Sequence, residues 1–274
     1  PNVGTNEETG RVAIGYKALA GGSGTAVQGI GNVALGGHAG EFNATSVVGG
    51  AVYVGHYAGN NTNGLTTTGF GQVAIGKNAM KFTVTSQSIA IGYLAMEDAA
   101  SPTIGGNSHV AIGKGAMRTA TVTGNNNIAI GTDANSSTAN VVSAVVALGY
   151  QSKAKGTCTI AIGCQASAGD DASSTDSIAI GNDSNTAGTK SISIGRNAST
   201  TGTHSIAIGD NAQVIDNYSV AIGAGASTNA ANQLAFGTAA QNLGSVVTQT
   251  ITPNKTWEVR INGVNYLIPI VAAP

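Results

Sequence analysis

The sequence predicts an all-β solenoid of about fourteen coils, and three observations support this fold class. A four-residue phrase occurs fourteen times: an aliphatic residue, a small residue in nearly every copy, an aliphatic or aromatic residue, and glycine. Successive phrase glycines are 14 residues apart in five cases and never more than 21. A small residue, Ala or Ser, follows each glycine three positions later. Self-similarity at a short fixed period is typical of stacked coils, each of which contacts only its neighbours.

The chain is expected to begin with a short lead before the coils. Residues 1–10 are polar and acidic, and we expect them to form an N-terminal lead or attachment segment. They do not resemble a secretory signal, and no apolar run approaches the roughly 20 residues that span a bilayer. Membrane insertion is therefore not expected. Residues 11–240 hold the repeats, and their insertions fall after the small residue and before the next strand, which predicts loops on one side of the solenoid.

The phrase predicts a strand with two different faces, because side chains alternate along a strand. The positions three and one before each glycine share a face and are aliphatic in nearly every copy. We expect this aliphatic face to form the core, and the opposite face of small residues to be a contact surface between chains. The predicted core comprises Ile14, Ile75, Ile112, Ile130, Ile162, Ile180, Ile194, Ile208 and Ile222.

The turn after each strand is expected to depend on the phrase glycine, which permits a positive φ at a corner. Polar residues follow it, and the small residue three positions later is expected to start a second, short strand. Two cysteines are too few for a disulfide framework. Cys158 shares the parity of Ile160, which places it inward, and Cys164 is expected at a turn. Two free thiols are favoured over a bridge.

The last segment, residues 241–274, is expected to form a C-terminal β-hairpin cap. Two strand-like runs flank Asn262-Gly263, a strong signal for a two-residue hairpin turn. Pro269 restricts the second run to an edge strand.

The phrase resembles the head repeat of trimeric autotransporter adhesins of the YadA type, carried by Ser177-Ile178-Ala179-Ile180-Gly181 and Ser205-Ile206-Ala207-Ile208-Gly209. The resemblance covers roughly residues 11–240 and implies a left-handed parallel β-roll with three chains side by side. No heptad run for a stalk accompanies it. The C-terminal segment weakly resembles the ends of phage tail-fibre and other virion appendage proteins.

The sequence does not favour a nucleic-acid, metal, dinucleotide or acyltransferase site. The net charge of −1 and pI of about 6.5 do not suit nucleic-acid binding. His38 and His56 are expected to lie near each other on adjacent coils, but scattered polar turns explain the four histidines better than a metal site. The glycine-rich fragments lack the full dinucleotide fingerprint. The repeat is too widely spaced for a hexapeptide acyltransferase. No catalytic residue, metal or cofactor is expected, and the protein is expected not to be an enzyme.

We expect instead a structural attachment protein. Aromatic residues near the phrase glycines or in insertions are candidate contacts for a receptor, although they could equally pad the loops; they are Tyr16, Tyr57, Tyr93, Tyr150, Phe42 and Phe70. The favoured context is a phage fibre or virion appendage, a homotrimer that contacts other virion proteins and a host glycan or protein. The head of a bacterial trimeric adhesin on the cell surface is one alternative, and a spacer or capsid decoration without a receptor is another.

Overall fold

The computed structural model describes residues 10–21, 31–42, 47–62, 68–83, 85–97, 104–118, 124–136, 143–169, 174–238, 255–261 and 264–270. The chain divides into two compact units, residues 1–241 and 242–274. The gaps before residue 174 fall where the sequence places the insertions. Within the described ranges there is no helix, and thus none that could cross a membrane.

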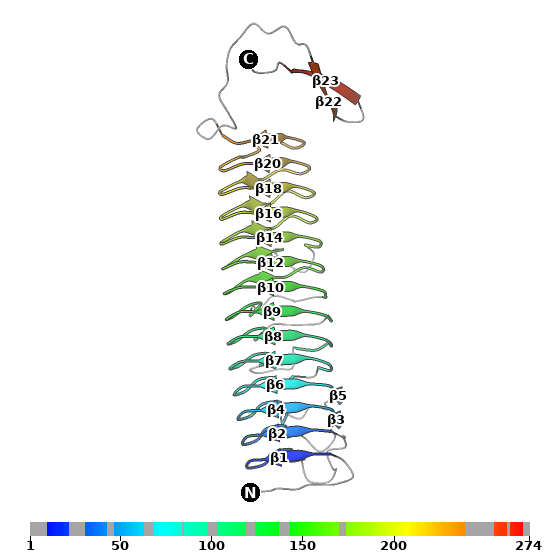
Figure 1. Ribbon diagram of the computed structural model, residues 1–274, viewed down its shortest axis with the longest axis vertical. Coiled ribbons are helices and arrows are strands. Elements are labelled where there is room, and N and C mark those ends of the chain that lie inside the picture. Colours follow the sequence, from blue (N-terminus) through cyan, green and yellow to red (C-terminus); the bar gives the residue numbers. More distant parts are fainter. Residues whose placement is uncertain are drawn as a thin grey trace. The chain divides into compact units, whose positions relative to one another are not determined.

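The first unit is a parallel β-solenoid, as predicted, in which each of the fourteen phrases supplies one strand to a single sheet (Figure 1). Every pair is parallel and in register, so each phrase position lies over the same position of the next coil; Ile178 pairs with Ile192, for example. The strands, in spatial order, are β1 (Val12–Ile14), β2 (Val33–Leu35), β4 (Val52–Val54), β6 (Val73–Ile75), β7 (Ile89–Ile91), β8 (Val110–Ile112), β9 (Ile128–Ile130), β10 (Val146–Leu148), β12 (Ile160–Ile162), β14 (Ile178–Ile180), β16 (Ile192–Ile194), β18 (Ile206–Ile208), β20 (Val220–Ile222) and β21 (Leu234–Phe236).

The phrase glycine is required for two reasons. Its φ is strongly positive, for example +135° at Gly181 and +137° at Gly195, as the sequence predicts. A Cβ atom at Gly181 would also overlap the carbonyl oxygen of Gly195 on the next coil. Any other residue would therefore strain the backbone and push two coils apart.

The two strand faces are assigned the wrong way round in the sequence prediction. The middle residue of the phrase is buried in every strand from β2 to β20 and half-buried only in β1 and β21. The flanking aliphatic residues point outward. Of the predicted core, Ile14, Ile75, Ile130, Ile194 and Ile208 are 36–56% exposed, and Ile112, Ile162, Ile180 and Ile222 are half-buried.

The physical reason lies in the thickness of the coil. Only a few residues separate the phrase glycine from the small residue that returns on the opposite side, and that residue is buried from Ala39 to Ala226. The two layers are therefore close together, and small side chains fill most of the space between them. The aliphatic residues that flank the inner position of each large-sheet strand lie outside, whereas a few larger side chains elsewhere in the coils, such as Ile104, Val145 and Val214, are buried.

The second layer differs between the two halves of the solenoid. In the later coils the small residue is followed by a short strand, as predicted, and these strands form a five-stranded parallel sheet. They are β11 (Lys153–Ala154), β13 (Ser167–Ala168), β15 (Asn185–Thr186), β17 (Ser199–Thr200) and β19 (Gln213–Val214). In the described residues of the earlier coils the same segment is a turn. A separate two-stranded parallel sheet is formed there by β3 (Val47–Gly49) and β5 (Thr68–Phe70), which directly precede β4 and β6 in the chain.

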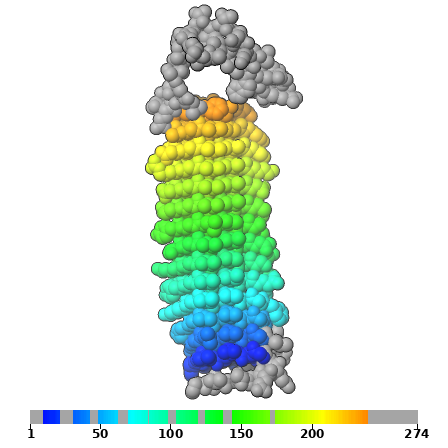
Figure 2. Space-filling view, in the orientation of Figure 1, coloured from blue at the N-terminus to red at the C-terminus, as the bar shows by residue number. Residues whose placement is uncertain are grey.

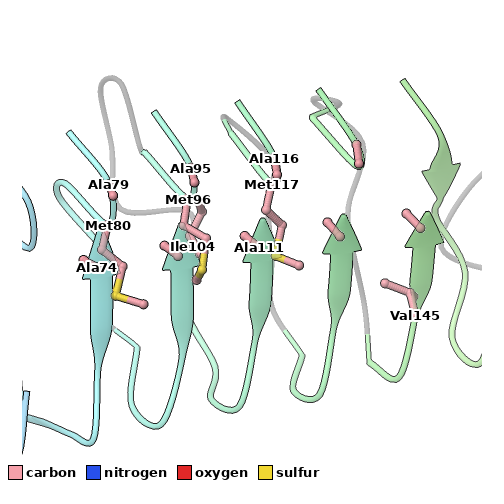
Figure 3. Packing of buried hydrophobic residues seen from close by; sticks show 14 of the residues in the cluster. Ala74, Ala79, Met80, Ala95, Met96, Ile104, Ala111, Ala116, Met117 and Val145 are labelled. Atoms are coloured by element: carbon pink, nitrogen blue, oxygen red, sulfur yellow. The ribbon is translucent and has the colours of Figure 1, made fainter. Parts of the chain in front are cut away.

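The earlier coils contain larger side chains. The three methionines of the chain, Met80, Met96 and Met117, each lie four residues after a phrase glycine, and all three are buried. Figure 3 shows them beside Ile104 and the inner alanines. Because methionine is flexible, it suits the irregular space of coils with insertions.

The second unit contains β22 (Lys255–Ile261) and β23 (Val264–Ile270), which pair antiparallel, with Ile261 opposite Val264. The two predicted strands are therefore present. Asn262 and Gly263, the predicted turn, lie outside the described residues.

Candidate binding surface

The residues directly after each phrase glycine form a continuous edge along the first unit, which we call the post-glycine edge. Its turns stack in register, because the second residue of one turn donates a backbone hydrogen bond to the first residue of the previous turn. These bonds are 2.7–3.1 Å long over the first seven coils and run from His38 to Tyr16, Tyr57 to Gly37, Asn78 to His56, Leu94 to Lys77, Gly115 to Tyr93 and Asp133 to Lys114.

This register places every first post-glycine residue in one column at a spacing of one coil. The first six are rings and cations apart from one glycine, and the later ones are mostly small or polar. From the N-terminal end the column is Tyr16, Gly37, His56, Lys77, Tyr93, Lys114, Thr132, Tyr150, Cys164, Asn182, Arg196, Asp210, Ala224 and Thr238. The blue and cyan coils of Figure 2 carry the first five of these positions.

Four rings gather at the N-terminal end of the edge. His38 stacks on Tyr57 with ring centroids 4.6 Å apart. His56 meets both rings edge-on, at 5.9 Å from His38 and 4.1 Å from Tyr57. Tyr16 meets His38 at 5.3 Å. The prediction that His38 and His56 are neighbours is confirmed. Lys81 adds a cation, with Nζ 5.0 Å from the centre of the Tyr57 ring.

Glu41 is held beside these rings by three donors. Its carboxylate accepts hydrogen bonds from Lys17 Nζ at 3.3 Å and Asn60 Nδ2 at 3.1 Å, and it lies 2.7 Å from His38 Nδ1. Burial alone would raise the pKa of Glu41, but the hydrogen bonds and charges of His38 and Lys17 outweigh it and lower the pKa. Glu41 therefore stays ionised, with its charge compensated locally.

Glu97 occupies the position equivalent to that of Glu41. Each of the two residues lies five positions after a phrase glycine. Its side chain is 10% exposed and accepts hydrogen bonds from Asn78 Nδ2 and Arg118 Nε, both at 3.1 Å. Both carboxylates of this half of the edge are thus neutralised by their own neighbours.

The predicted receptor contacts fall into three groups. Tyr16, Tyr93 and Tyr150 all lie in the post-glycine column and are 71%, 45% and 50% exposed. Tyr57 is half-buried in the ring group, and Phe70 is 56% exposed on β5. Phe42 is only 3% exposed.

The proposed contact at Phe42 is therefore wrong. Its ring lies 5.8 Å from that of Tyr53, inside the coil. The insertion that follows Phe42 suggested a loop position, but its backbone forms bridges to Gly21 and Asn61 and belongs to the stacked layer.

Two further expectations from sequence are corrected or refined. Cys158 is exposed and not inward-facing, because it precedes the strand in a turn with φ +57°. Both cysteines are free and exposed.

His109 is buried, and its Nε2 lies 3.0 Å from the Gly105 carbonyl oxygen. Burial lowers the pKa of His109 and favours the neutral ring. Within the described ranges, no group of three His, Cys, Asp or Glu side chains could hold a metal.

The outward aliphatic residues form a second candidate surface, the aliphatic ladder: the first and third residues of every strand of the large sheet. Strand register stacks them in two rows along the whole sheet. At the two ends, Val12 is 42% exposed and Leu234 is 61% exposed. A continuous apolar surface of this length is rare on a protein that acts as a monomer.

Comparison with known families identifies the repeat of the later coils. Residues 146–166, 172–198 and 201–226 match the family model of the YadA head domain repeat. These residues include β10 to β20, which confirms the resemblance for this part of the chain. No curated protein matches the chain.

Proposed function

We propose that the chain is the adhesive head of a multivalent surface protein, that it acts as a homotrimer, and that the aliphatic ladder is the contact between chains. The exposed ladder is the observation that carries this proposal. Parallel sheets are normally covered on both faces, and here the inner face packs on the second layer whereas the outer face is aliphatic. The inner alanines are buried within each coil and cannot serve as the interface expected from the sequence.

Copies of the same chain fit the ladder better than an unrelated partner. Each ladder repeats one pair of aliphatic residues at the same spacing, so two ladders can pack coil against coil over their whole length. Closed symmetric assemblies are the usual outcome for such surfaces. The YadA head repeats, a family of adhesins in which three heads associate, support three copies and a bacterial cell-surface location.

An adhesive role is consistent with the surfaces that stay exposed when the ladder is buried between chains. The post-glycine edge presents exposed rings and cations at fixed spacing, and three chains would present three copies of it. Weak contacts can then combine, and avidity can exceed the single-site affinity by about 10²–10⁴-fold. This arrangement provides binding rather than catalysis, and we propose no enzymatic activity.

The oligomeric state of the purified chain tests the interface. Light scattering should give about three times the 26.9 kDa chain mass. Replacing two ladder residues by charge, Ile194→Asp with Ile208→Asp, should abolish the trimer. The control places two negative charges on the post-glycine edge, Gln165→Glu with Asn182→Asp, and should leave the mass unchanged. A monomeric wild-type chain, or equal masses for the two variants, would overturn the proposed interface.

A thiol-labelling experiment covers the case in which the charged variant fails to fold. In Ile208→Cys, the introduced thiol should be protected from a water-soluble maleimide in the native protein. The exposed thiols of Cys158 and Cys164 supply the internal reference for full labelling. Labelling of position 208 as fast as the two native cysteines would place the ladder in solvent and contradict the interface.

The adhesive role itself is tested on cells. Fluorescent wild-type protein should bind a panel of bacterial and animal cells on at least one surface type. The Ile194→Asp, Ile208→Asp chain should bind that surface at least about tenfold more weakly, because avidity is lost. Wild-type protein that binds none of the cells would contradict adhesion and favour a spacer.

A virion appendage is the second candidate, and the paired strands β22 and β23 are the observation that favours it, because the sequence of this segment resembles the ends of such proteins. Gold-labelled antibody against the chain separates the two contexts. Label on bacterial surfaces would support the adhesin, and label on virus particles would support the appendage.

A further inference from the structure

We propose that the first six coils of the post-glycine edge bind an acidic polysaccharide that runs along the stacked turns. This inference names the ligand class of the proposed adhesive function and rests on it. The element that carries the proposal is the consecutive column of Lys77, Tyr93 and Lys114, extended toward the N-terminus by His56 and the ring group of Tyr16, His38 and Tyr57.

The spacing suits a linear polymer. Backbone hydrogen bonds from Leu94 to Lys77 and from Gly115 to Tyr93 set these turns one coil apart. Neighbouring strands are about 4.8 Å apart, so the backbones of Lys77 and Lys114 lie roughly 9.6 Å apart with Tyr93 midway between them. Two cations at this separation can contact successive acidic groups of one chain, while the ring between them packs against a sugar.

The positive charge on the edge is available to a ligand. Lys77 and Lys114 are exposed, and neither forms an ion pair with any residue that the structure describes. The nearby carboxylates of Glu41 and Glu97 are already bound by Lys17, Arg118 and their other neighbours. Among the residues that the structure describes, the next carboxylate along the chain is that of Asp133, which lies beside Gly115 at the end of the proposed track.

The rings supply the second part of the recognition. Tyr93 is 45% exposed and Tyr16 is 71% exposed, so each offers a face or edge to a ligand. The contact between His38 and Glu41, at 2.7 Å, holds the ring group in place before any ligand arrives. Rings fixed in advance lose little conformational freedom on binding, which favours weak, repeated contacts of the kind that polysaccharides make.

Charge density favours a polysaccharide over a nucleic acid. Double-stranded DNA carries one negative charge about every 1.7 Å, and its binding usually depends on a dense cationic surface. Here the chain has a net charge of −1, and the column has one lysine in every second coil between Lys77 and Lys114. A polymer with an acidic group on only some of its sugars matches this sparse pattern.

The later coils provide a contrast within the same edge. Beyond Lys114 the post-glycine positions include Asp133, Asp183 and Asp210, and Arg196 is paired with Asp210 at 2.7 Å. The track is therefore confined to the earlier coils, where insertions also occur.

Binding to defined polymers tests the proposal with the full chain. The probes are dextran sulfate, polygalacturonate, unsubstituted dextran and single-stranded DNA, immobilised for interferometry. We expect binding to at least one acidic polysaccharide and none to dextran. The first two probes separate sulfate from carboxylate recognition. Affinity should fall as salt rises, because counterions compete for the lysines.

Matched lysine variants connect the binding to the edge. Lys77→Gln with Lys114→Gln should lower the affinity by about tenfold or more and reduce the salt dependence. The control, Lys153→Gln with Lys190→Gln, removes the same charge from exposed positions outside the post-glycine edge and should bind within about twofold of wild type. Tyr93→Ala should weaken binding without changing the salt dependence.

Three outcomes would overturn the inference: no binding to either acidic polymer, equal losses for the two lysine pairs, or stronger binding to DNA than to both acidic polysaccharides. The cell assay keeps this test separate from the adhesive role. If wild-type protein and Lys77→Gln, Lys114→Gln bind cells equally, adhesion stands and the track is wrong. If the polymers bind through these lysines but no cell does, the track stands and the adhesive role is wrong.

Discussion

Tyr53 occupies the inner position of its strand, where most strands have alanine, and it is fully buried. Its ring fits because the residues four after two phrase glycines are Gly40 and Gly59, and a Cβ atom at either would overlap the ring. Its hydroxyl donates a hydrogen bond to Gln72 Oε1, and Gln72 Nε2 in turn donates to the Thr85 carbonyl. Burial raises the pKa of the Tyr53 hydroxyl, which keeps it protonated as a donor.

This complementarity predicts a coupling between Tyr53 and Gly59. Gly59→Ala should lower the free energy of unfolding by about 1–3 kcal/mol more than Gly71→Ala does, because overpacking adds to backbone strain. Gly71 is the matched control: its φ of +64° is close to the +62° of Gly59, and its Cβ would meet open space. In a Tyr53→Ala background the extra cost should disappear. Urea denaturation measures it for wild type, Tyr53→Ala, and each glycine variant alone and combined with Tyr53→Ala; additive losses for Gly59→Ala and Tyr53→Ala would contradict the contact.

In each coil, the strand of the large sheet has an inner side that holds a small residue at every position except Tyr53, and an outer side that holds large residues. Where β16 has serine in place of alanine at the inner position, Ser193 Oγ donates a hydrogen bond to the Asn185 carbonyl at 2.7 Å and lies 2.7 Å from Thr200 Oγ1. A buried hydroxyl is thus satisfied within the same pair of layers.

The assigned faces predict losses of stability of different size at two adjacent positions of β14. Ala179→Leu places a large side chain between the two layers and should reduce the free energy of unfolding by about 1–3 kcal/mol or more. Ile180→Leu conserves volume on the ladder and should cost less than about 1.5 kcal/mol. Thermal unfolding followed by circular dichroism measures both. A larger loss of unfolding free energy for Ile180→Leu than for Ala179→Leu would indicate that the aliphatic face is the interior, and would contradict the assigned faces.

At the scale of the whole molecule, the first unit is a thin stack that carries the aliphatic ladder on its outer surface. If the ladder is buried between copies, folding and association are linked, and the folded state should be favoured by mass action. The interior of a single chain, built mainly of alanine and hydroxyl side chains, buries less apolar area per residue than a core of branched side chains would.

The linkage predicts that the melting temperature of wild-type protein rises with concentration over a range of about a hundredfold. Differential scanning calorimetry at several concentrations is the measurement. The chain with Ile194→Asp and Ile208→Asp should melt at a lower temperature that does not depend on concentration, or lack a transition. A wild-type melting temperature independent of concentration, together with a monomer mass, would contradict linked association.

The proposed binding surface was only partly predictable. Tyr16, Tyr93 and Tyr150 are predicted contacts because they directly follow phrase glycines, and this stays a prediction; Lys77 and Lys114 hold the same position but were not among the predicted contacts. Aligning the repeats on glycine would have revealed both lysines. Phe42 could not be classified, because whether a residue beside an insertion belongs to the stacked layer depends on backbone bridges between coils.

The sequence by itself determined that the fold is a parallel solenoid, where its strands lie and why each ends at glycine, because these features follow from local periodicity and from backbone conformations that glycine alone adopts easily. Which face of each strand is the interior was decided only by the tertiary structure. Alternation divides the side chains of a strand into two sets, but the distance between the two layers of a coil selects the set that fits between them. That distance is short because the chain returns within a few residues of each phrase glycine, so alanine lies inside and isoleucine outside.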